Sequence, residues 1–423
     1  MTALESSIAP QSADRHAGEI AERVRRFYET HPYPRPVEGL DDYRSAWEDE
    51  GRRRAMHHLV WPGVPFESPG RRVLVAGCGT AQGARYALRD PGHEVLGIDV
   101  SEASLEATRT LKERYGLDNL ELARLPIEDA GELEREFDLV VCTGVLHHLP
   151  DPLRGLGALS RVLAPGGVLH LMVYAPYGRT GVYMMQRYGR LLGLGTSEAE
   201  IDDLAASLRE IPPHHPLRFL FEKSPDFRSH AGLADALLNP QDRAYTVPEL
   251  LELVESAGLR FGRWVRQASY QPYCGAPLLT PHRDRLAALD PEAQWAAMEL
   301  FRGTMVRHSV LLRRYGDDLP TPEKSDWRAE AGDWRSWVPV RRADTVTVTE
   351  GIPETAAAVL INRSHDYTDL YLPVDHRQAA WLSSVNGQRP LGGIIGDGEV
   401  EAGMDFFRRL WWYDQVVFDT SRD

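Results

Sequence analysis

Two glycines and an aspartate carry the clearest chemical signal in this sequence. In VLVAGCGTAQGARYAL (73–88) an apolar run precedes Gly77, Cys78 and Gly79, and a helical pattern follows. A strand, turn and helix of this kind present backbone N–H groups and a positive helix end to a nucleotide-like ligand, and glycine allows close approach. Asp99 follows a second apolar run, 95–98, and lies twenty residues after Gly79. A carboxylate there can accept both hydroxyls of a ribose.

Each of these features also has an alternative explanation. A lone G-x-G occurs in ordinary turns between a strand and a helix. Asp99 could instead cap the next helix, although Ser101 already suits that role. The segments that follow must therefore decide between the classes of protein that share this opening.

The segment 137–174 favours one of those classes. It contains FDLVV, VLHHL, DP and RVLAPGG in that order. With the glycine turn and Asp99, these phrases resemble class I S-adenosylmethionine (SAM)-dependent methyltransferases over about residues 70–175. A nicotinamide-dependent oxidoreductase would share the opening, but it would need neither VLHHLPDP nor a last strand inserted antiparallel, which we expect at 306–312.

The resemblance implies SAM as the cofactor and a set of residues that hold it. Glu128 is implied to bind the adenine amino group and Ile127 to lie against the ring, with Asp129 as a competing acid. For either acid the alternative is a carboxylate at a helix N-terminus. The implied contacts in the core are Ala76, Gly77, Cys78, Gly79, Gln82, Asp99, Val100, Ile127, Glu128, Thr143 and Gly144.

Two positions depart from the family pattern. Val75 stands where members often carry an acid, and Ala81 replaces the usual third glycine. Without the acid, another group must orient the ammonium of SAM, and Gln82 or a carbonyl near Thr143 is the candidate. Ala81 is small enough to cause little steric difficulty.

The N-terminal segment YETHPYPR (28–35) resembles a Tyr-x-x-x-Pro-Tyr-Pro-Arg lead-in found in a subset of these enzymes, where it folds over the SAM pocket. The resemblance implies that Tyr28, Tyr33 and Arg35 form a lid or contact the SAM carboxylate. The alternative is a helix stop whose tyrosines pack on the domain surface.

Three residues are candidates for catalysis. An acceptor hydroxyl or protonated amine must lose a proton near the methyl group, and His147, Tyr174 or Tyr33 could take it. A carboxylate or neutral nitrogen needs positioning alone. We expect no metal, because the adjacent His147 and His148 point in different directions and no second group of ligands accompanies them; His148 is expected to pack or cap.

Residues 176–245 are mostly helical and form an insertion after the fifth strand, where a substrate lid is often built. Tyr177, Arg179 and Tyr245 are the candidates for acceptor binding. The alternative is that Asp242 and Arg243 form a solvated pair and the tyrosines belong to an amphipathic core.

The expected fold class is α/β, with a Rossmann-like seven-stranded methyltransferase sheet, a helical lid insertion and a small α+β, winged-helix-like C-terminal domain. The winged-helix likeness rests on short helices joined by NGQRP and closed by a strand. Its acidity argues against DNA, so dimer formation, pocket closure, peptide docking or a structural brace is preferred. The expected segments are an N-terminal lid at 1–65, the SAM-binding core at 66–175, the insertion at 176–245, completion of the core at 246–316, a linker at 317–341 and the C-terminal domain at 342–423.

Composition limits the choice of partners. The 423 residues are 43% hydrophobic and 26% charged, with a net charge of −14 that gives no general attraction to nucleic acid. The three cysteines are far apart, which fits a reducing cytoplasm, and we expect neither an export signal nor a membrane helix. The predicted function is methyl transfer to oxygen or nitrogen of a small molecule or short peptide, by a protein that could be a homodimer. A non-catalytic subunit that binds SAM or a partner stays open.

Overall fold

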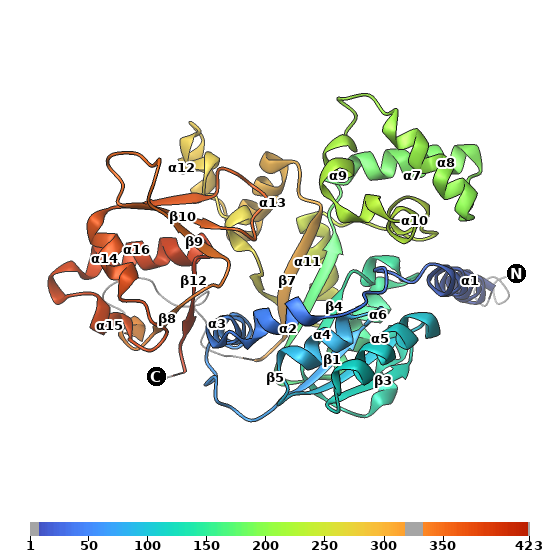
Figure 1. Cartoon of the computed structure of the whole chain (residues 1–423), viewed down its shortest axis with the longest axis horizontal. Coiled ribbons are helices and arrows are strands. Elements are labelled where there is room, and N and C mark those ends of the chain that lie inside the picture. Colours follow the sequence, from blue (N-terminus) through green and yellow to red (C-terminus); the bar gives the residue numbers. More distant parts are fainter. Residues whose placement is uncertain (1–7, 318–332, 422–423) are drawn as a thin grey trace, which may run out of the picture. The chain divides into compact units, whose positions relative to one another are not determined.

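The computed structural model describes residues 8–317 and 333–421 (Figure 1). Packing divides the chain into two compact units. Unit 1 consists of Met1–Asp41, Gly70–Arg260 and Gly303–Ser309, and unit 2 of Asp42–Pro69, Phe261–Arg302 and Val310–Asp423. The six predicted segments follow the order of the chain, whereas each unit combines pieces that are distant in sequence.

A seven-stranded sheet has the order β3-β2-β1-β4-β5-β7-β6. Strands β1 to β5 pair in parallel, with Val75 of β1 opposite Gly97 of β2 and Val141 of β4. Strands β1, β2 and β4 are nearly continuous apolar runs because the middle of a parallel sheet is covered on both faces. The bounds of the strands of this sheet are β1 (Arg72–Ala76), β2 (Glu94–Asp99), β3 (Leu120–Arg124), β4 (Phe137–Thr143), β5 (Leu163–Tyr174), β6 (Leu259–Trp264) and β7 (Arg307–Arg314).

The predicted last strand, β7, lies between β5 and β6. Ala175 N donates to Val306 O, while His170 contacts Ser309. The residue numbers in β7 thus rise as those of their partners in β5 fall, so β7 pairs antiparallel to β5, as predicted.

The helices that flank the parallel strands begin and end at local signals. Ser101 caps the predicted helix α5 by accepting from Ser104 N, and Gly116 ends it with φ 60°. Asp151 caps α6 through Arg154 N, and Thr246 forms a capping box at α11. The helices of this group are α1 (Ile8–Thr30), α4 (Gln82–Arg89), α5 (Glu102–Tyr115), α6 (Pro152–Arg161) and α11 (Val247–Ser256), with the short 3₁₀ turns η1 (Ile127–Leu133) and η2 (Leu146–His148).

The insertion has a hydrophobic core of its own, to which Phe27 of α1 contributes. Figure 1 shows its helices gathered as one group. They are α7 (Thr180–Leu192), α8 (Glu198–Arg209), α9 (Arg218–Lys223), η3 (Pro225–Arg228) and α10 (His230–Leu238). The predicted helical insertion is therefore a packed body that also buries Phe27, near the end of the N-terminal helix.

Unit 2 contains two consecutive helices, α2 (Asp41–Glu48) and α3 (Glu50–Val60), which are separated where Asp49 caps α3 by accepting from Arg52 N. The described part of the C-terminal region has five short strands. Its elements, with those of 265–302, are η4 (Gln267–Tyr270), η5 (Ala276–Leu279), α12 (Arg283–Ala287), α13 (Pro291–Arg302), η7 (Asp333–Arg335), β8 (Val338–Arg341), β9 (Thr345–Val348), β10 (Ala358–Asn362), β11 (Tyr371–Val374), α14 (His376–Ser383), α15 (Leu391–Ile394), η8 (Asp397–Glu399), α16 (Val400–Trp412) and β12 (Val416–Asp419).

The C-terminal strands form two small sheets, β11-β10-β9 and β12-β8, beside three helices. This is the expected α+β composition, and the winged-helix likeness stays a prediction. Trp334 and Trp337 are buried in the core of unit 2. These two tryptophans of the segment 317–341 are therefore part of a packed core, while Trp327 lies outside the described residues.

A buried charge cluster fixes the interior of unit 2. Asp414 is fully buried, with Arg342 at 3.5 Å, Arg263 at 3.6 Å and Nε2 of His365 at 3.1 Å. Burial alone would raise the pKa of Asp414, but the hydrogen bond with His365 and the two guanidinium charges outweigh it and hold that pKa below its ordinary value.

Candidate cofactor and acceptor site

The glycine turn lies where β1 ends, and its geometry needs glycine. Gly77 has φ 71° and Gly79 has φ 55°. A Cβ on Gly77 would lie 2.4 Å from a methyl carbon of Val145, and one on Gly79 would lie 3.1 Å from the carbonyl oxygen of Tyr33. Other residue types would therefore meet both backbone strain and a collision here.

The amide groups of the turn differ from expectation. Gly77 N and Cys78 N both donate to Ile98 O at 2.9 Å, and Gly79 N donates to Asp99. The prediction that these N–H groups face the ligand is wrong, because they hold the turn against β2. A ligand would meet the glycine backbone and the side chains around it.

Asp99 lies at the end of β2 and faces the turn. Its Oδ2 accepts from Gly79 N at 2.8 Å and its Oδ1 from Ser101 N at 2.9 Å. Burial raises the pKa of Asp99, and these backbone donors oppose the rise. Each carboxylate oxygen has a second lone pair, so Asp99 can still accept hydroxyl donors and fits a ribose.

The start of α4 and the end of β4 meet through a side-chain hydrogen bond. Gln82 Nε2 donates to Thr143 Oγ1 at 2.6 Å, and the neighbouring Gly144 has φ 82°. Gln82 and Thr143, the candidates for orienting the ammonium of SAM in place of the missing acid, therefore lie side by side. Val100 follows Asp99 directly and is half-buried.

The predicted adenine contacts lie in η1, after β3. Ile127 is buried, and burial raises the pKa of the half-buried Glu128. The competing acid, Asp129, lies 3.7 Å from Arg154. Asp129 thus has a structural partner, which leaves Glu128 as the better adenine candidate.

The N-terminal lead-in lies against the glycine turn. Thr80 Oγ1 donates to Pro34 O at 2.7 Å, and the carbonyl of Tyr33 approaches Gly79. The side chain of Arg35 is exposed, and it forms no ion pair within the described part of the chain. The lead-in therefore contacts the candidate cofactor edge, while the proposed contact of Arg35 with a carboxylate stays a prediction.

Three tyrosines and two aspartates form what we call the Tyr–Asp cluster, composed of Tyr28, Tyr33, Tyr174, Asp226 and Asp235. The hydroxyl of Tyr28 donates to Asp235 at 2.8 Å, and that of Tyr33 donates to Asp226 at 2.7 Å. Burial, followed by the charge of Asp235, raises the pKa of all three tyrosines. Their hydroxyls therefore stay protonated, which suits hydrogen-bond donation better than proton removal.

His147 lies beside this cluster and is fully buried. Its ring centroid is 3.8 Å from that of Tyr174, and neither ring nitrogen has a hydrogen-bond partner in the described part of the chain. Burial, with His148 and Arg179 nearby, lowers the pKa of His147 well below its ordinary value. Nδ1 of His148 lies 2.6 Å from Gln241 O, which agrees with a packing role.

The predicted acceptor residues lie in different environments. Arg179 is buried, pairs with Asp242 at 3.0 Å and lies over the ring of Tyr174 at 3.5 Å. Tyr245 is also buried, its hydroxyl has no partner among the described residues, and its backbone N donates to Tyr174 O. Tyr177 is 39% exposed. The structure brings Arg179 and Tyr245 to Tyr174, and the role of Tyr177 stays a prediction.

Sequence reasoning missed Asp226, Asp235 and Asn239. Asn239 Nδ2 donates to the hydroxyl of Tyr28 at 3.0 Å. Asp235 is buried within the apolar run AGLADALL of α10. An aspartate inside an apolar helix was the signal that could have found it, because such a group must be paired or functional.

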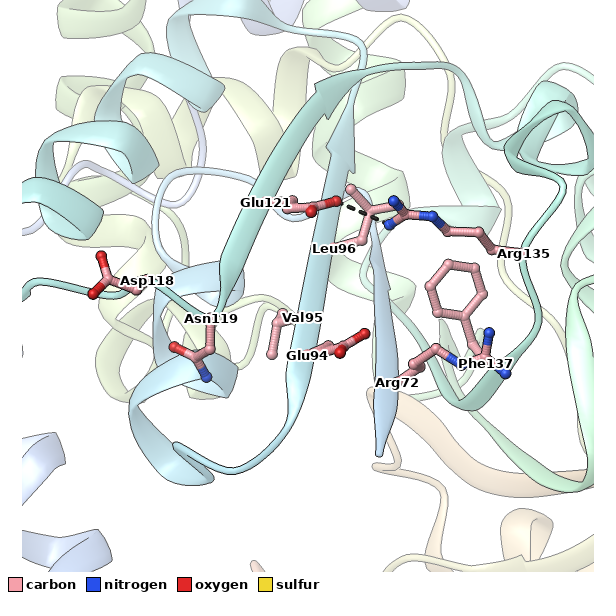
Figure 2. A pocket seen from close by; sticks show the side chains of 9 residues that line it. All are labelled: Arg72, Glu94, Val95, Leu96, Asp118, Asn119, Glu121, Arg135 and Phe137. Carbon is pink, nitrogen blue, oxygen red and sulfur yellow. Dashed lines mark hydrogen bonds and ion pairs between the residues drawn. The ribbon is translucent and has the colours of Figure 1, made fainter. Parts of the chain in front are cut away.

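A hollow lies at the edge of the sheet opposite the glycine turn (Figure 2). Its volume is about 450 Å³, and it is lined by Arg72, Glu94, Val95, Leu96, Asp118, Asn119, Glu121, Arg135 and Phe137. Three of these begin β1, β2 and β4, so the hollow lies at the amino ends of the strands. Figure 2 shows the ion pair between Arg135 and Glu121 at 2.9 Å. The hollow is separate from the glycine turn and Asp99.

Within 8–317 and 333–421, no three or more His, Cys, Asp or Glu side chains are grouped to hold a metal ion. Over the same residues, each helix is too short or too polar to cross a membrane.

The sheet order and the carboxyl-edge residues define the class I methyltransferase fold. A model of the methyltransferase domain matches residues 74–169. The chain thus carries a methyltransferase domain at 74–169, with the class I sheet order.

Two relatives and one solved structure illustrate the likeness. An uncharacterized protein of Synechococcus sp. is 34% identical over 263 residues, covering 60% of this chain and 62% of that protein. A ubiquinone biosynthesis O-methyltransferase of Acinetobacter baylyi is 30% identical over 143 residues, covering 34% of this chain and 54% of that enzyme. The structure of PKMT2 from Rickettsia typhi in complex with AdoHcy superposes with a TM-score of 0.59 at 15% identity, covering 86% of this chain and 75% of that one.

The chain spans less than two thirds of the length of these two relatives. The likeness to PKMT2 concerns the fold, and at 86% of the chain it extends beyond the 74–169 domain.

Proposed function

We propose that this chain transfers a methyl group from SAM to an oxygen or nitrogen atom of a small molecule or short peptide by direct in-line displacement. The observation that carries the proposal is the hydrogen bond from Gly79 N to Asp99 Oδ2, inside the methyltransferase domain. This bond holds a half-buried carboxylate beside a glycine turn at the carboxyl edge of the sheet. The similarity to an O-methyltransferase and to a protein crystallised with AdoHcy supports it.

In this proposal, SAM supplies an electrophilic methyl carbon on its sulfonium when bound. Asp99 accepts the ribose hydroxyls, while Glu128 and Ile127 hold the adenine. Tyr28, Tyr33 and Arg35 close over the methionine end, near Gln82 and Thr143. The chain must also keep water out and align the acceptor with the methyl carbon.

The acceptor would enter between the end of β5 and the insertion, where Arg179 and Tyr245 contact Tyr174. His147 is a neutral, buried group at this place. The lowered pKa of His147 weakens it as a base, but its nitrogens can orient an acceptor. The protein would act in the cytoplasm, alone or as a homodimer, with 342–423 as a structural brace.

Calorimetry with SAM tests the cofactor site. We expect the unmodified chain to bind SAM and Asp99→Ala to bind it at least about tenfold more weakly, equivalent to about 1.4 kcal/mol. Asp118→Ala is the matched control, since Asp118 is exposed at the opposite edge of the sheet. Equal affinities for both variants, or no binding by the unmodified chain, would contradict the proposal.

A second measurement separates an enzyme from a subunit that only binds SAM. We expect label from tritiated SAM to enter an extract of the expressing cells in a single turnover. Binding of SAM without transfer of label would favour the non-catalytic alternative.

A further inference from the structure

The Tyr–Asp cluster holds two acidic groups that lack a cationic partner. Neither Asp226 nor Asp235 forms an ion pair within the described part of the chain, and Asp235 is only 3% exposed. Their recorded donors are uncharged, namely Tyr33 and Ser224 for Asp226, and Tyr28 and Asn239 for Asp235. Buried carboxylates are ordinarily paired with a cation, so this cluster is suited to receive one.

The nearby guanidinium is already engaged. Arg179 is buried and pairs with Asp242, whose other carboxylate oxygen is buried with no partner among the described residues. The charge of Arg179 also acts on Asp235, but one guanidinium compensates only one of the three aspartates, so the balance of charge stays negative. An anionic acceptor would be repelled there, whereas an ammonium would be attracted.

The rings of the cluster favour the same ligand. Tyr28 and Tyr33 come from the lead-in, and faces of tyrosine rings attract cations. The ring of Tyr174, at the end of β5, already holds the guanidinium of Arg179 at 3.5 Å. His147, fully buried with both nitrogens unpartnered, lies against the ring of Tyr174. The unpaired ring nitrogens of His147 independently indicate that a polar ligand binds beside the cluster.

The cluster adjoins the candidate cofactor edge. The carbonyl of Tyr33 approaches Gly79, while its hydroxyl reaches Asp226 at 2.7 Å. One residue therefore connects the glycine turn with the acidic groups, and Tyr174 ends a strand whose neighbour β4 ends at Thr143.

We propose that the Tyr–Asp cluster is an ammonium site that selects a primary amine as the methyl acceptor, with Asp235 as the group that takes its proton. This proposal rests on the proposed function. The ammonium nitrogen gives one proton to the carboxylate of Asp235, and its freed lone pair forms the bond to the methyl carbon. The bond between sulfur and that carbon breaks with its electron pair on sulfur, leaving a methylated ammonium and a neutral thioether. Burial also raises the pKa of Asp235, which suits proton exchange with an amine.

The first test measures binding of a defined amine. The probe is n-butylammonium chloride, titrated by calorimetry into protein saturated with S-adenosylhomocysteine, with n-butanol as the uncharged control. We expect n-butylammonium to bind at least about tenfold more tightly than n-butanol, and Asp235→Asn to abolish the difference. Asp118→Asn is the matched control and should keep it. Equal binding of the two probes by the unmodified protein would overturn the proposal.

The second test measures transfer. Extract of the expressing cells is divided, and primary amines in one half are acetylated, with hydroxylamine used afterwards to free hydroxyl groups. We expect the acetylated half to incorporate at least about tenfold less label from tritiated SAM. Asp235→Asn should reduce transfer by a similar factor and leave the affinity for SAM unchanged. If Asp235→Asn does not fold, Asp226→Asn replaces it, because Asp226 is the other carboxylate of the cluster; the preference for the amine should then fall while the affinity for SAM stays unchanged.

Three results would overturn the inference while leaving the proposed function intact. They are label that survives acetylation, full transfer by Asp235→Asn, and a tenfold loss of SAM affinity in that variant. A loss of SAM affinity in Asp235→Asn would mean that the cluster binds the ammonium group of SAM and not that of an acceptor. Absence of SAM binding by the unmodified chain would instead remove the proposed function, and the inference with it.

Discussion

Single residues at the carboxyl edge determine whether a ligand can approach the sheet. Gly77 shows this, because its left-handed backbone and its contact with Val145 both require the absence of a side chain. Its amide is paired with Ile98, so the glycine serves geometry and close packing, not hydrogen bonding to a ligand.

Gly77→Ala should cost more stability than an equivalent change elsewhere. Gly116→Ala is the control, since Gly116 has φ 60° and a Cβ there would meet nothing within 4 Å. The control should lose about 1 kcal/mol from backbone strain. Gly77→Ala should lose a further 1–3 kcal/mol, roughly, because Val145 must move. Denaturant unfolding measures both variants, and equal losses would show that the contact with Val145 is unimportant.

At the scale of elements, α1 is held on α5 by one carboxylate. Glu29 accepts from Ala103 N at 3.0 Å, Glu102 N at 3.2 Å and the Ser101 hydroxyl at 3.1 Å. The backbone hydrogen bond from Ala103 is the main reason that the pKa of Glu29 is lowered. An acid from one helix thus supplements the N-terminal cap of another.

Glu29→Ala should therefore loosen this pair of helices. We expect a loss of about 1–2 kcal/mol in the free energy of unfolding, with faster hydrogen exchange at the amides of 102–104. Glu19→Ala tests the same helix at an exposed position and should change neither. Unchanged exchange in Glu29→Ala would mean that the cap of Ser101 suffices.

The elements that were predictable are those whose signals are local. Helix 102–115 has its cap at Ser101 and its stop at Gly116, and the apolar runs of β1, β2 and β4 are continuous. Asp99 and the glycine turn were predictable for the same reason. The Tyr–Asp cluster was not, because Tyr28 and Asp235 are 207 positions apart and no local pattern pairs them. The strands β10 and β11 pair only 10 to 16 positions apart, but with five and four residues they are too short to give a clear sequence pattern.

At the scale of the whole molecule, each unit contains a histidine that is held neutral. His58 of unit 2 is 1% exposed, and burial lowers its pKa to about 4; burial does the same to His170 in unit 1. The nearest carboxylate to His58, Asp419 at 3.8 Å, opposes this shift without cancelling it.

Both units should therefore lose stability in mild acid. Below the ordinary histidine pKa near 6.5, the unfolded chain binds a proton that the folded chain refuses until about pH 4. Stability should fall across that window, by roughly 3 kcal/mol at most for His58, and then level off. Unfolding of the unmodified chain and of His58→Gln at pH 7, 5.5 and 4.5 measures this, with His16→Gln as an exposed control. Parallel pH curves for the unmodified chain and His58→Gln would contradict the assignment.

The bonds from Tyr28 to Asp235 and from Tyr33 to Asp226 join the first forty residues to a segment two hundred positions later. A chimera made from two related proteins must therefore keep the two tyrosines and the two aspartates from the same parent. If residues 176–245 come from another protein while the N-terminal segment is kept, Tyr28 and Tyr33 face side chains that did not evolve with them. The N-terminal segment and the insertion should therefore be exchanged together in any engineered variant.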